Sequence, residues 1–178
     1  MDKNELRCLM KDKRLQLSAK TFSLYNQQIY SKVLRHPQVQ NAKMIGCYVS
    51  LPSEVDTLQI IDSLLPYKRI CVPKVEGNHM QFYEILSLDE LKPGHFHVLE
   101  PITSQMIMPE EIDCMLVPLL AYDSLGYRVG YGKGYYDRYF QSDFHGYKIG
   151  LAFSFQYVDQ IQHDVFDQRL DEVIHEIP

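Results

Sequence analysis

Three glycines alternate with other residues in the segment 126–138, which reads GYRVGYGKGYYDR. Glycine allows backbone conformations that aim consecutive N–H groups at one point, and such a nest binds anions. A helix predicted to begin just after the last glycine adds unpaired N–H groups and a favourable dipole. Arg128 and Lys133 add positive charge to the same segment. The segment therefore predicts a binding site for a chain of phosphates.

Two known phosphate-binding templates do not fit this segment. The P-loop needs Ser or Thr after its Gly-Lys pair, and here Gly134 follows Lys133. The dinucleotide fingerprint needs its third glycine one residue later than Gly134. A tight glycine-rich turn without a ligand is the alternative interpretation. The tyrosine pair after the last glycine, the flanking Arg128 and Lys133, and the aspartate that follows weigh against it.

Two further groups of charged residues have both a functional and a structural interpretation. Glu54 lies in a loop predicted between a strand and a helix, where it is either a ligand contact or a solvated carboxylate. Asp56 and Thr57 are better explained as residues that cap the following helix. A basic stripe recurs at helical spacing near the N-terminus, at Lys3, Arg7, Lys11 and Arg14. A solvated helix face is the ordinary explanation of such a stripe.

The composition excludes several classes of protein. The chain has 178 residues, of which 46% are apolar, and a formal net charge of −5. The acidic balance argues against a nucleic-acid partner, and no apolar run is long enough to cross a membrane. The charged N-terminus lacks the apolar centre of a signal peptide, so we expect a cytoplasmic protein without a membrane partner. His95 and His97 lack the further ligands of a zinc set, and no motif of a covalent hydrolase is present.

The elements that must position these residues alternate between strands and helices. Helices are predicted at 2–17, from Ser18 to Pro37, at 56–65 with an Asp56–Gln59 capping box, and at 135–140. Strands are predicted at 44–49, 69–73 (ended by Pro73), 80–85, 114–117, 148–153 and 173–177, with a loop-rich stretch over 91–109. Such alternation predicts an α/β fold with a mostly parallel sheet covered on both faces. Ligands bind at the carboxyl ends of such strands, where the loops after Val49 and Val117 lie. The three apolar-run cysteines, Cys47, Cys71 and Cys114, are expected to be buried free thiols.

At these residues the sequence resembles the 5-formyltetrahydrofolate cyclo-ligase family, also called methenyltetrahydrofolate synthetase. The segment 126–138 is similar to the family signature, with Val129 in place of the usual Leu. Lys3 and Arg7, the segment 54–57 and Asp171 resemble further family positions in the same order. The resemblance spans nearly the whole chain and implies one domain over 1–178. It implies a three-layer α/β sandwich similar to ribose-5-phosphate isomerase and the CoA transferases.

The resemblance also implies roles for individual residues. It assigns ATP binding to Lys3, Arg7, Arg128, Val129, Gly130, Tyr131, Gly132, Lys133, Gly134, Tyr135 and Tyr136. It assigns folate binding to Val49, Glu54, Tyr131, Gly132, Lys133, Gly134 and Tyr135. Asp137 and Asp171 would bind Mg²⁺, and Lys133 and Arg128 would act on the transferring phosphoryl group. The implied ligands are ATP, Mg²⁺ and 5-formyltetrahydrofolate. The protein is expected to be a monomer.

The implied reaction is an ATP-dependent ring closure to 5,10-methenyltetrahydrofolate through an N5-iminophosphate, with release of ADP and phosphate. Phosphoryl transfer mainly needs positioning and neutralisation of charge, so no side-chain nucleophile is required. Two alternatives come from other classes. A sugar-phosphate isomerase on a related fold would consume no ATP. A non-catalytic folate- or nucleotide-binding protein would have lost Glu54, Lys133 or Asp137, and all three are present.

Overall fold

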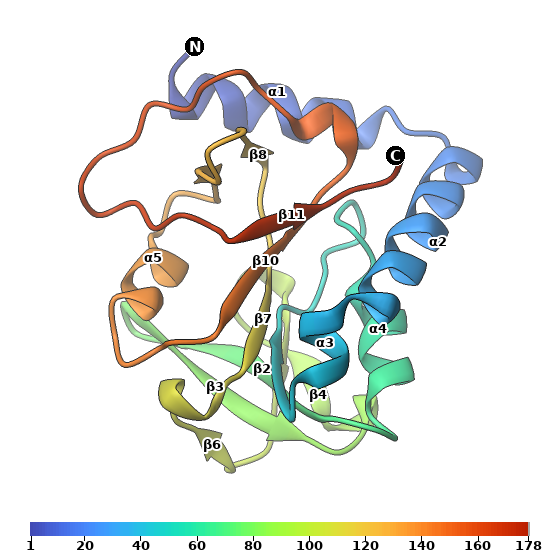
Figure 1. Ribbon diagram of the computed structural model, residues 1–178, viewed down its shortest axis with the longest axis vertical. Helices are drawn as coiled ribbons and strands as arrows, with labels where there is room; N and C mark the ends of the chain where they lie inside the picture. The colour runs from blue at the N-terminus through green and yellow to red at the C-terminus, as the bar shows by residue number, and fades with distance from the viewer. Residues whose placement is uncertain (178) are drawn as a thin grey trace.

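A seven-stranded sheet forms the centre of the protein (Figure 1), in a computed structural model that describes residues 1–177. The strands are β1 Met44–Cys47, β2 Arg69–Glu76, β3 His79–Ile85, β6 Met106–Ile107, β7 Cys114–Val117, β10 Tyr147–Leu151 and β11 Glu172–Ile174. Their order is β11-β10-β7-β1-β2-β3-β6. The pairs from β11 to β2 are parallel, and β3 and β6 are antiparallel to their neighbours. A mostly parallel sheet was expected from the alternating elements, and it is confirmed.

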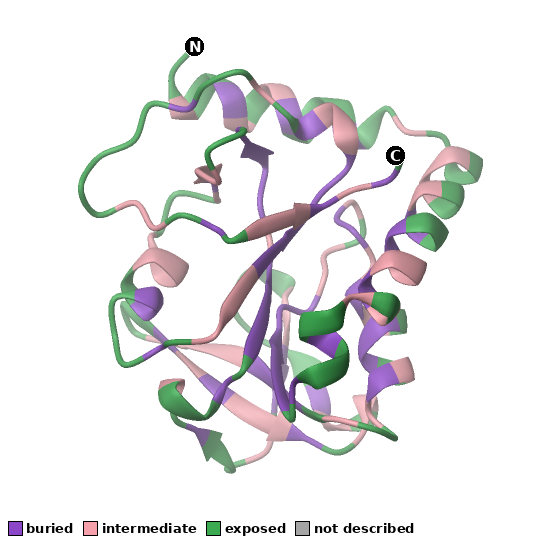
Figure 2. Ribbon diagram, viewed as in Figure 1, coloured by how far each residue is buried: buried purple, intermediate pink, exposed green. Residues whose placement is uncertain are grey.

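Helices cover both faces of this sheet because the buried strands are apolar on both sides. Cys114 and Leu116 pack in one cluster with α2 Ala19–Arg35, α3 Pro37–Asn41 and α4 Thr57–Leu64. The intervening Met115 and Val117 pack on the opposite face, with α5 Tyr135–Phe140. Buried segments therefore run through the middle of the ribbon, between the two helical layers (Figure 2). The α/β class with helices on both faces is confirmed.

Helix α1, Lys3–Leu15, lies apart from both layers and packs on the short strands β8 Ala121–Tyr122 and β9 Arg128–Val129. Leu6 and Met10 supply its apolar side, which joins Leu120 and Val129 in a third small cluster. Asp2 and Glu5 form a capping box that begins the helix. This packing brings the N-terminus beside the start of the glycine-rich segment, more than a hundred residues away in sequence.

The predicted helices and most of the predicted strands are present with small shifts at their ends. Two local expectations are wrong. Strand β2 continues through Pro73 because that residue pairs with Phe82 of β3, while the pairing with β1 ends at Cys71. A proline is tolerated where its strand has only one neighbour. The N-terminal cap of α4 is Asp56 without a capping box, since the Asp56 N–H donates to Asn26 at 2.7 Å instead of to Gln59.

The loop-rich stretch contains a small hairpin, β4 Leu91–Pro93 with β5 Leu99–Pro101. Short 3₁₀ turns lie at Leu88–Glu90, His95–His97, Pro109–Glu111 and Ser154–Gln156. Cys47, Cys71 and Cys114 are buried free thiols, as expected, and Cys8 is an exposed one. Within residues 1–177 there is no helix with the length and apolarity that a membrane crossing needs.

Candidate functional site

A cavity of about 550 Å³ opens at the carboxyl ends of the central strands. Val49 follows β1, Pro118 follows β7, and Pro73 and Val75 of β2 line its floor and wall. Parallel sheets bind their ligands at this edge, and the sequence predicted the site here. Every predicted ATP- and folate-binding residue lines the cavity: Lys3, Arg7, Val49, Glu54, Arg128, Val129, Gly130, Tyr131, Gly132, Lys133, Gly134, Tyr135 and Tyr136.

The glycine-rich segment forms one wall of this cavity between β9 and α5. Gly132 and Gly134 have φ angles of +100° and +71°, which residues with a side chain rarely adopt. Gly134 is also the residue at which α5 begins. The Gly130 carbonyl accepts a hydrogen bond from Arg7 Nε at 2.8 Å. This hydrogen bond holds the segment against α1, with the Arg7 side chain beside it.

Two cations of this segment lie in very different surroundings. Arg128 is buried, its guanidinium 5.4 Å from the Tyr136 ring centroid and 3.8 Å from the Asp137 carboxylate. Burial lowers the Arg128 pKa, and the charge of Asp137 opposes that shift. Lys133 is exposed at the mouth of the cavity, with its ammonium 5.9 Å from the Phe96 ring centroid. Arg128 is therefore fixed in the cavity wall by its neighbours, whereas Lys133 is free to meet a ligand.

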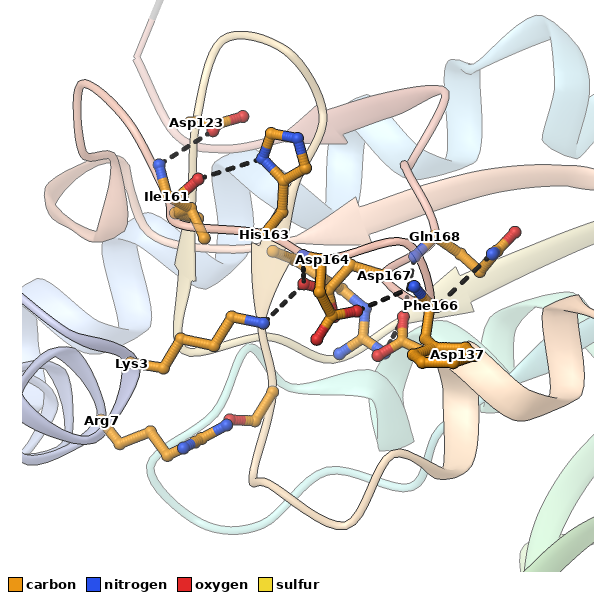
Figure 3. Close-up of polar contacts among 12 residues, drawn as sticks. Lys3, Arg7, Asp123, Asp137, Ile161, His163, Asp164, Phe166, Asp167 and Gln168 are labelled. Carbon is orange, nitrogen blue, oxygen red and sulfur yellow. Dashed lines mark hydrogen bonds and ion pairs between the residues drawn. The ribbon is translucent and has the colours of Figure 1, made fainter.

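Two carboxylates, Asp137 and Asp167, lie near Lys3 on this side of the cavity, as Figure 3 shows. Asp137, in the first turn of α5, accepts a hydrogen bond from the Gln168 N–H at 3.2 Å. The neighbouring Asp167 also lines the cavity and forms an ion pair with Lys3 at 2.6 Å. Burial raises the Asp167 pKa, but hydrogen bonds from Lys3 and from the Asp164 N–H outweigh it, and the net pKa is lowered. Both carboxylates therefore offer oxygen atoms as ligands beside the glycine-rich wall of the cavity.

Asp171 lies elsewhere. It directly precedes β11, and the register pairs Glu172 with Ile149, so Asp171 stands beside Lys148 near the start of β10. Its carboxylate accepts the Lys148 N–H at 2.8 Å. The amino ends of parallel strands lie opposite the edge that carries the cavity, and Asp171 does not line the cavity. The structure thus does not bring Asp171 to Asp137, and their shared metal site stays a prediction.

Glu54 is buried, with a 5% exposed fraction, so the interpretation as a solvated loop carboxylate is wrong. Its Oε1 accepts the Leu51 N–H at 2.7 Å, and its Oε2 accepts the Tyr131 hydroxyl at 3.0 Å. Arg14 lies 4.0 Å from the same Oε2. Burial raises the pKa of Glu54, while these three groups lower it in part. The carboxylate therefore lies at the cavity wall in a partly compensated environment.

The neighbouring polar residues have structural roles, as expected. Asp56 accepts the Leu58 N–H and caps α4. The Thr57 hydroxyl donates to the Tyr48 carbonyl and accepts the Ser50 N–H. Of the two tyrosines after the glycines, Tyr136 packs on Phe82 and under Arg128, whereas Tyr135 reaches the Gly77 carbonyl. These contacts hold the walls of the cavity in place.

Several lining residues were not found from the sequence. The tip of the β4–β5 hairpin brings His95, Phe96 and Val98 to the cavity, and Asp167 comes from the loop before β11. His95 was interpreted as a loop residue, and nothing in the local spacing of this hairpin indicates a ligand site. For α1, the basic stripe near the N-terminus was the sequence feature that could indicate a ligand site. Lys3 and Arg7 line the cavity, and Arg14 is buried, so a solvated face does not describe this stripe.

The arrangement has two chemically distinct sides. Lys3, Arg7, Lys133 and the glycine-rich backbone suit a chain of phosphates. The other side combines apolar groups with the buried carboxylate of Glu54, and it suits a flat ring that carries N–H donors. Its members are Tyr48, Val49, Val75, Met80, Phe96, Tyr136 and Glu54. Two different ligands can therefore meet in one cavity.

Comparisons with known proteins agree with this arrangement. A sequence profile of the 5-formyltetrahydrofolate cyclo-ligase family matches residues 1–176. The mouse 5-formyltetrahydrofolate cyclo-ligase is 31% identical, over 98% of this chain and 93% of its own length. The Mycoplasma genitalium enzyme of the same name is 32% identical, over 98% of both chains.

Two solved structures have the same fold. The 5,10-methenyltetrahydrofolate synthetase of Aquifex aeolicus superposes with a TM-score of 0.88 at 34% identity, over 98% of this chain and 89% of its own. The Mycoplasma pneumoniae synthetase superposes with a TM-score of 0.82 at 31% identity, over 99% of this chain and 100% of its own. With a family profile that matches residues 1–176, relatives that align over nearly the whole chain and a shared fold, the chain belongs to the 5-formyltetrahydrofolate cyclo-ligase family.

Proposed function

We propose that this protein catalyses the ATP- and Mg²⁺-dependent closure of 5-formyltetrahydrofolate to 5,10-methenyltetrahydrofolate, with release of ADP and phosphate. The observation that carries the proposal is one cavity shared by a cationic glycine-rich wall and an apolar wall with the buried carboxylate of Glu54. Membership of the cyclo-ligase family supports the same reaction.

Each side of the cavity would bind one of the two substrates. Lys3, Arg7 and the N–H groups of Gly130 to Gly134 would hold the ATP phosphates, because they provide positive charge and unpaired donors. Glu54 would accept hydrogen bonds from N–H groups of the reduced pterin, while Val49 and Tyr135 would contact its ring. This division would bring the γ-phosphate beside the formylated nitrogen.

The reaction then needs two displacement steps. The formyl oxygen attacks the γ-phosphorus, the bond to ADP breaks, and an N5-iminophosphate results. The N10 lone pair attacks the former formyl carbon, the carbon–oxygen bond breaks, and phosphate leaves as the N10 proton is lost. Lys133 would neutralise charge on the transferring phosphoryl group, and buried Arg128 would hold Asp137 and the segment in place.

Mg²⁺ fits the residues present. It prefers oxygen ligands and usually binds through one or two carboxylates together with substrate phosphates. Asp137 lines the phosphate side, and Asp167 lines it beside Asp137 and Lys3. When bound, Mg²⁺ would neutralise charge on the phosphate chain, and Asp137 would hold it with a second carboxylate, Asp171 as the resemblance implies or Asp167 as the placement favours.

The decisive assay incubates the protein with 5-formyltetrahydrofolate, ATP and Mg²⁺ and follows the methenyl product by its near-ultraviolet absorbance. We expect one ADP and one phosphate for each product molecule, and no product without ATP. Release of AMP and pyrophosphate would contradict the phosphoryl-transfer route. Turnover of a sugar phosphate without ATP would favour the isomerase alternative.

A titration of rate against Mg²⁺ separates the two possible metal ligands. Asp137→Asn should raise the Mg²⁺ concentration for half-maximal rate. If Asp167 is the partner, Asp167→Asn raises it too, the double mutant is less than additive, and Asp171→Asn leaves the curve unchanged. A shift in Asp171→Asn with none in Asp167→Asn would instead support the ligand pair that the resemblance implies. Unchanged curves for all three variants would remove the proposed metal site.

A further inference from the structure

A chain of hydrogen-bonded polar groups joins helix α1 to the carboxylate of Glu54 through Tyr131 of the glycine-rich segment; its two ends, Arg14 and Glu54, are buried. Arg14 Nη2 donates to the Tyr131 hydroxyl at 2.9 Å, and that hydroxyl donates to Glu54 Oε2 at 3.0 Å. A tyrosine hydroxyl has a single proton. Because Arg14 can only donate, the Tyr131 proton is left to point at Glu54. The direction of both hydrogen bonds is therefore set by Arg14.

Arg14 is placed to act at a distance from any ligand. Its side chain is 4% exposed, and it does not line the cavity, whereas Tyr131 and Glu54 both do. Its guanidinium lies 4.0 Å from Glu54 Oε2 and 5.8 Å from the Tyr131 ring centroid. Its Nε has no hydrogen-bond partner within residues 1–177. Burying a guanidinium with so few hydrogen-bond partners costs folding free energy, unless its charge stabilises the groups around it.

The groups that face Glu54 explain what this charge does. Burial and the tyrosines Tyr48 and Tyr136 surround the carboxylate with little that favours its ionised form. The opposing groups are the Leu51 N–H, the Tyr131 hydroxyl and the charge of Arg14. Ionised, the carboxylate is a strong acceptor at both oxygens, whereas a protonated carboxyl group accepts more weakly and has a proton of its own to donate.

We propose that Arg14 and Tyr131 are positioning residues that hold Glu54 as an ionised, oriented acceptor for the folate. Arg14 supplies the charge, and Tyr131 transmits it through one directed hydrogen bond. The chain also joins three elements: α1, the loop after β1 and the glycine-rich segment. The inference rests on the proposed folate-binding role of Glu54.

The test is the pH dependence of kcat/KM for 5-formyltetrahydrofolate at saturating MgATP, which reports ionisations of the enzyme–MgATP complex and of the free folate. Because the active form of Glu54 is ionised, activity is lost as pH falls through its pKa. Tyr131→Phe and Arg14→Gln each remove a group that lowers this pKa, so the acid limb should move upward. We expect a shift of about one pH unit for the loss of one charge-assisted hydrogen bond.

Three further variants complete the design. Arg14→Lys keeps the charge and should show a smaller shift than Arg14→Gln. Lys13→Gln removes an exposed charge from the same turn of α1 and should leave the profile unchanged. In Glu54→Gln the acid limb due to this group should vanish, and adding Tyr131→Phe should have no further effect on the profile. The KM for the folate should rise in Arg14→Gln and Tyr131→Phe, while the KM for ATP should not.

The outcomes separate this inference from the proposed function. Tyr131→Phe removes one oxygen atom and tests the idea even if Arg14→Gln fails to fold. An unmoved acid limb in Tyr131→Phe, with Glu54→Gln impaired in folate use, overturns the inference and leaves the proposed function standing. An unchanged folate KM in Glu54→Gln removes Glu54 from the site and overturns the inference with it. Absence of methenyl product with the unmodified protein overturns the proposed function itself.

Discussion

Individual residues of the glycine-rich segment differ in what their surroundings allow. Arg128 is held in the cavity wall by Tyr136 and Asp137, and burial lowers its pKa. Lys133 is exposed, and its ammonium lies 5.9 Å from the centroid of the Phe96 ring. A cation without a fixed partner can follow charge as it develops on a phosphoryl group. We therefore assign Lys133 to the reaction step and Arg128 to positioning.

Lys133→Ala should lower kcat by about 10²–10³-fold, the range seen when one donor to a developing charge is removed. The KM for the folate should change little, because the lost interaction belongs to the transition state. Steady-state kinetics with both substrates varied give the two parameters. Lys13→Ala, an exposed lysine of α1, is the matched control. A kcat close to that of the unmodified protein would make Lys133 an ordinary surface residue.

At the scale of elements, the site depends on a segment that is neither strand nor helix. Residues 130–134 connect β9 to α5, and their glycines turn the backbone toward the cavity. A Cβ added at Gly132 would lie 3.3 Å from Arg7 Cζ, and Gly132 has a φ of +100°. The close approach of α1 and the unusual backbone angle both require glycine here.

Gly132→Ala and Gly77→Ala separate backbone strain from ligand binding. Both glycines have positive φ angles, but a Cβ at Gly77 would meet no atom within 4 Å. Each substitution should cost about 1–2 kcal/mol of unfolding free energy. Gly132→Ala alone should raise the KM for ATP, because it also displaces Arg7 and redirects the N–H groups. Chemical denaturation and ATP kinetics measure the two effects, and equal ATP kinetics in the two variants would contradict a phosphate-binding role.

At the scale of the whole molecule, the cavity gathers its lining from almost every part of the chain. Its residues come from α1, from the loops after β1 and β7, from β2, from the β4–β5 hairpin tip and from the loop that carries Asp167. Few of these segments are neighbours in sequence. A ligand bound there contacts all of them together, so its binding energy should stabilise the fold as a unit.

Thermal unfolding should therefore show one transition, consistent with the predicted single domain, and ligands should shift it upward. A ligand at 100 times its Kd adds about 2.7 kcal/mol. For a chain of this size that corresponds to a rise in Tm of about 5–10 °C. MgATP and 5-formyltetrahydrofolate can each be tested by differential scanning calorimetry. Two separate transitions, with only one moved by ligand, would argue against a single cooperative unit.

Local pattern and chemistry determined much of this protein from its sequence. The apolar runs predicted the central strands, and Ser18 predicted the start of α2, because strand burial and helix capping are short-range effects. The alternating glycines with Arg128 and Lys133 predicted the phosphate-binding wall, because a nest is made by consecutive residues.

The tertiary structure alone decided which distant residues meet. It buried Glu54 and Arg14 together, brought the hairpin tip of Phe96 to the cavity, and placed Asp167 beside the Lys3 side chain. It also carried Asp171 to the amino end of β10, although the family resemblance implied that this residue is a metal ligand. Strand register and helix packing depend on contacts across the whole chain, and no local spacing records them.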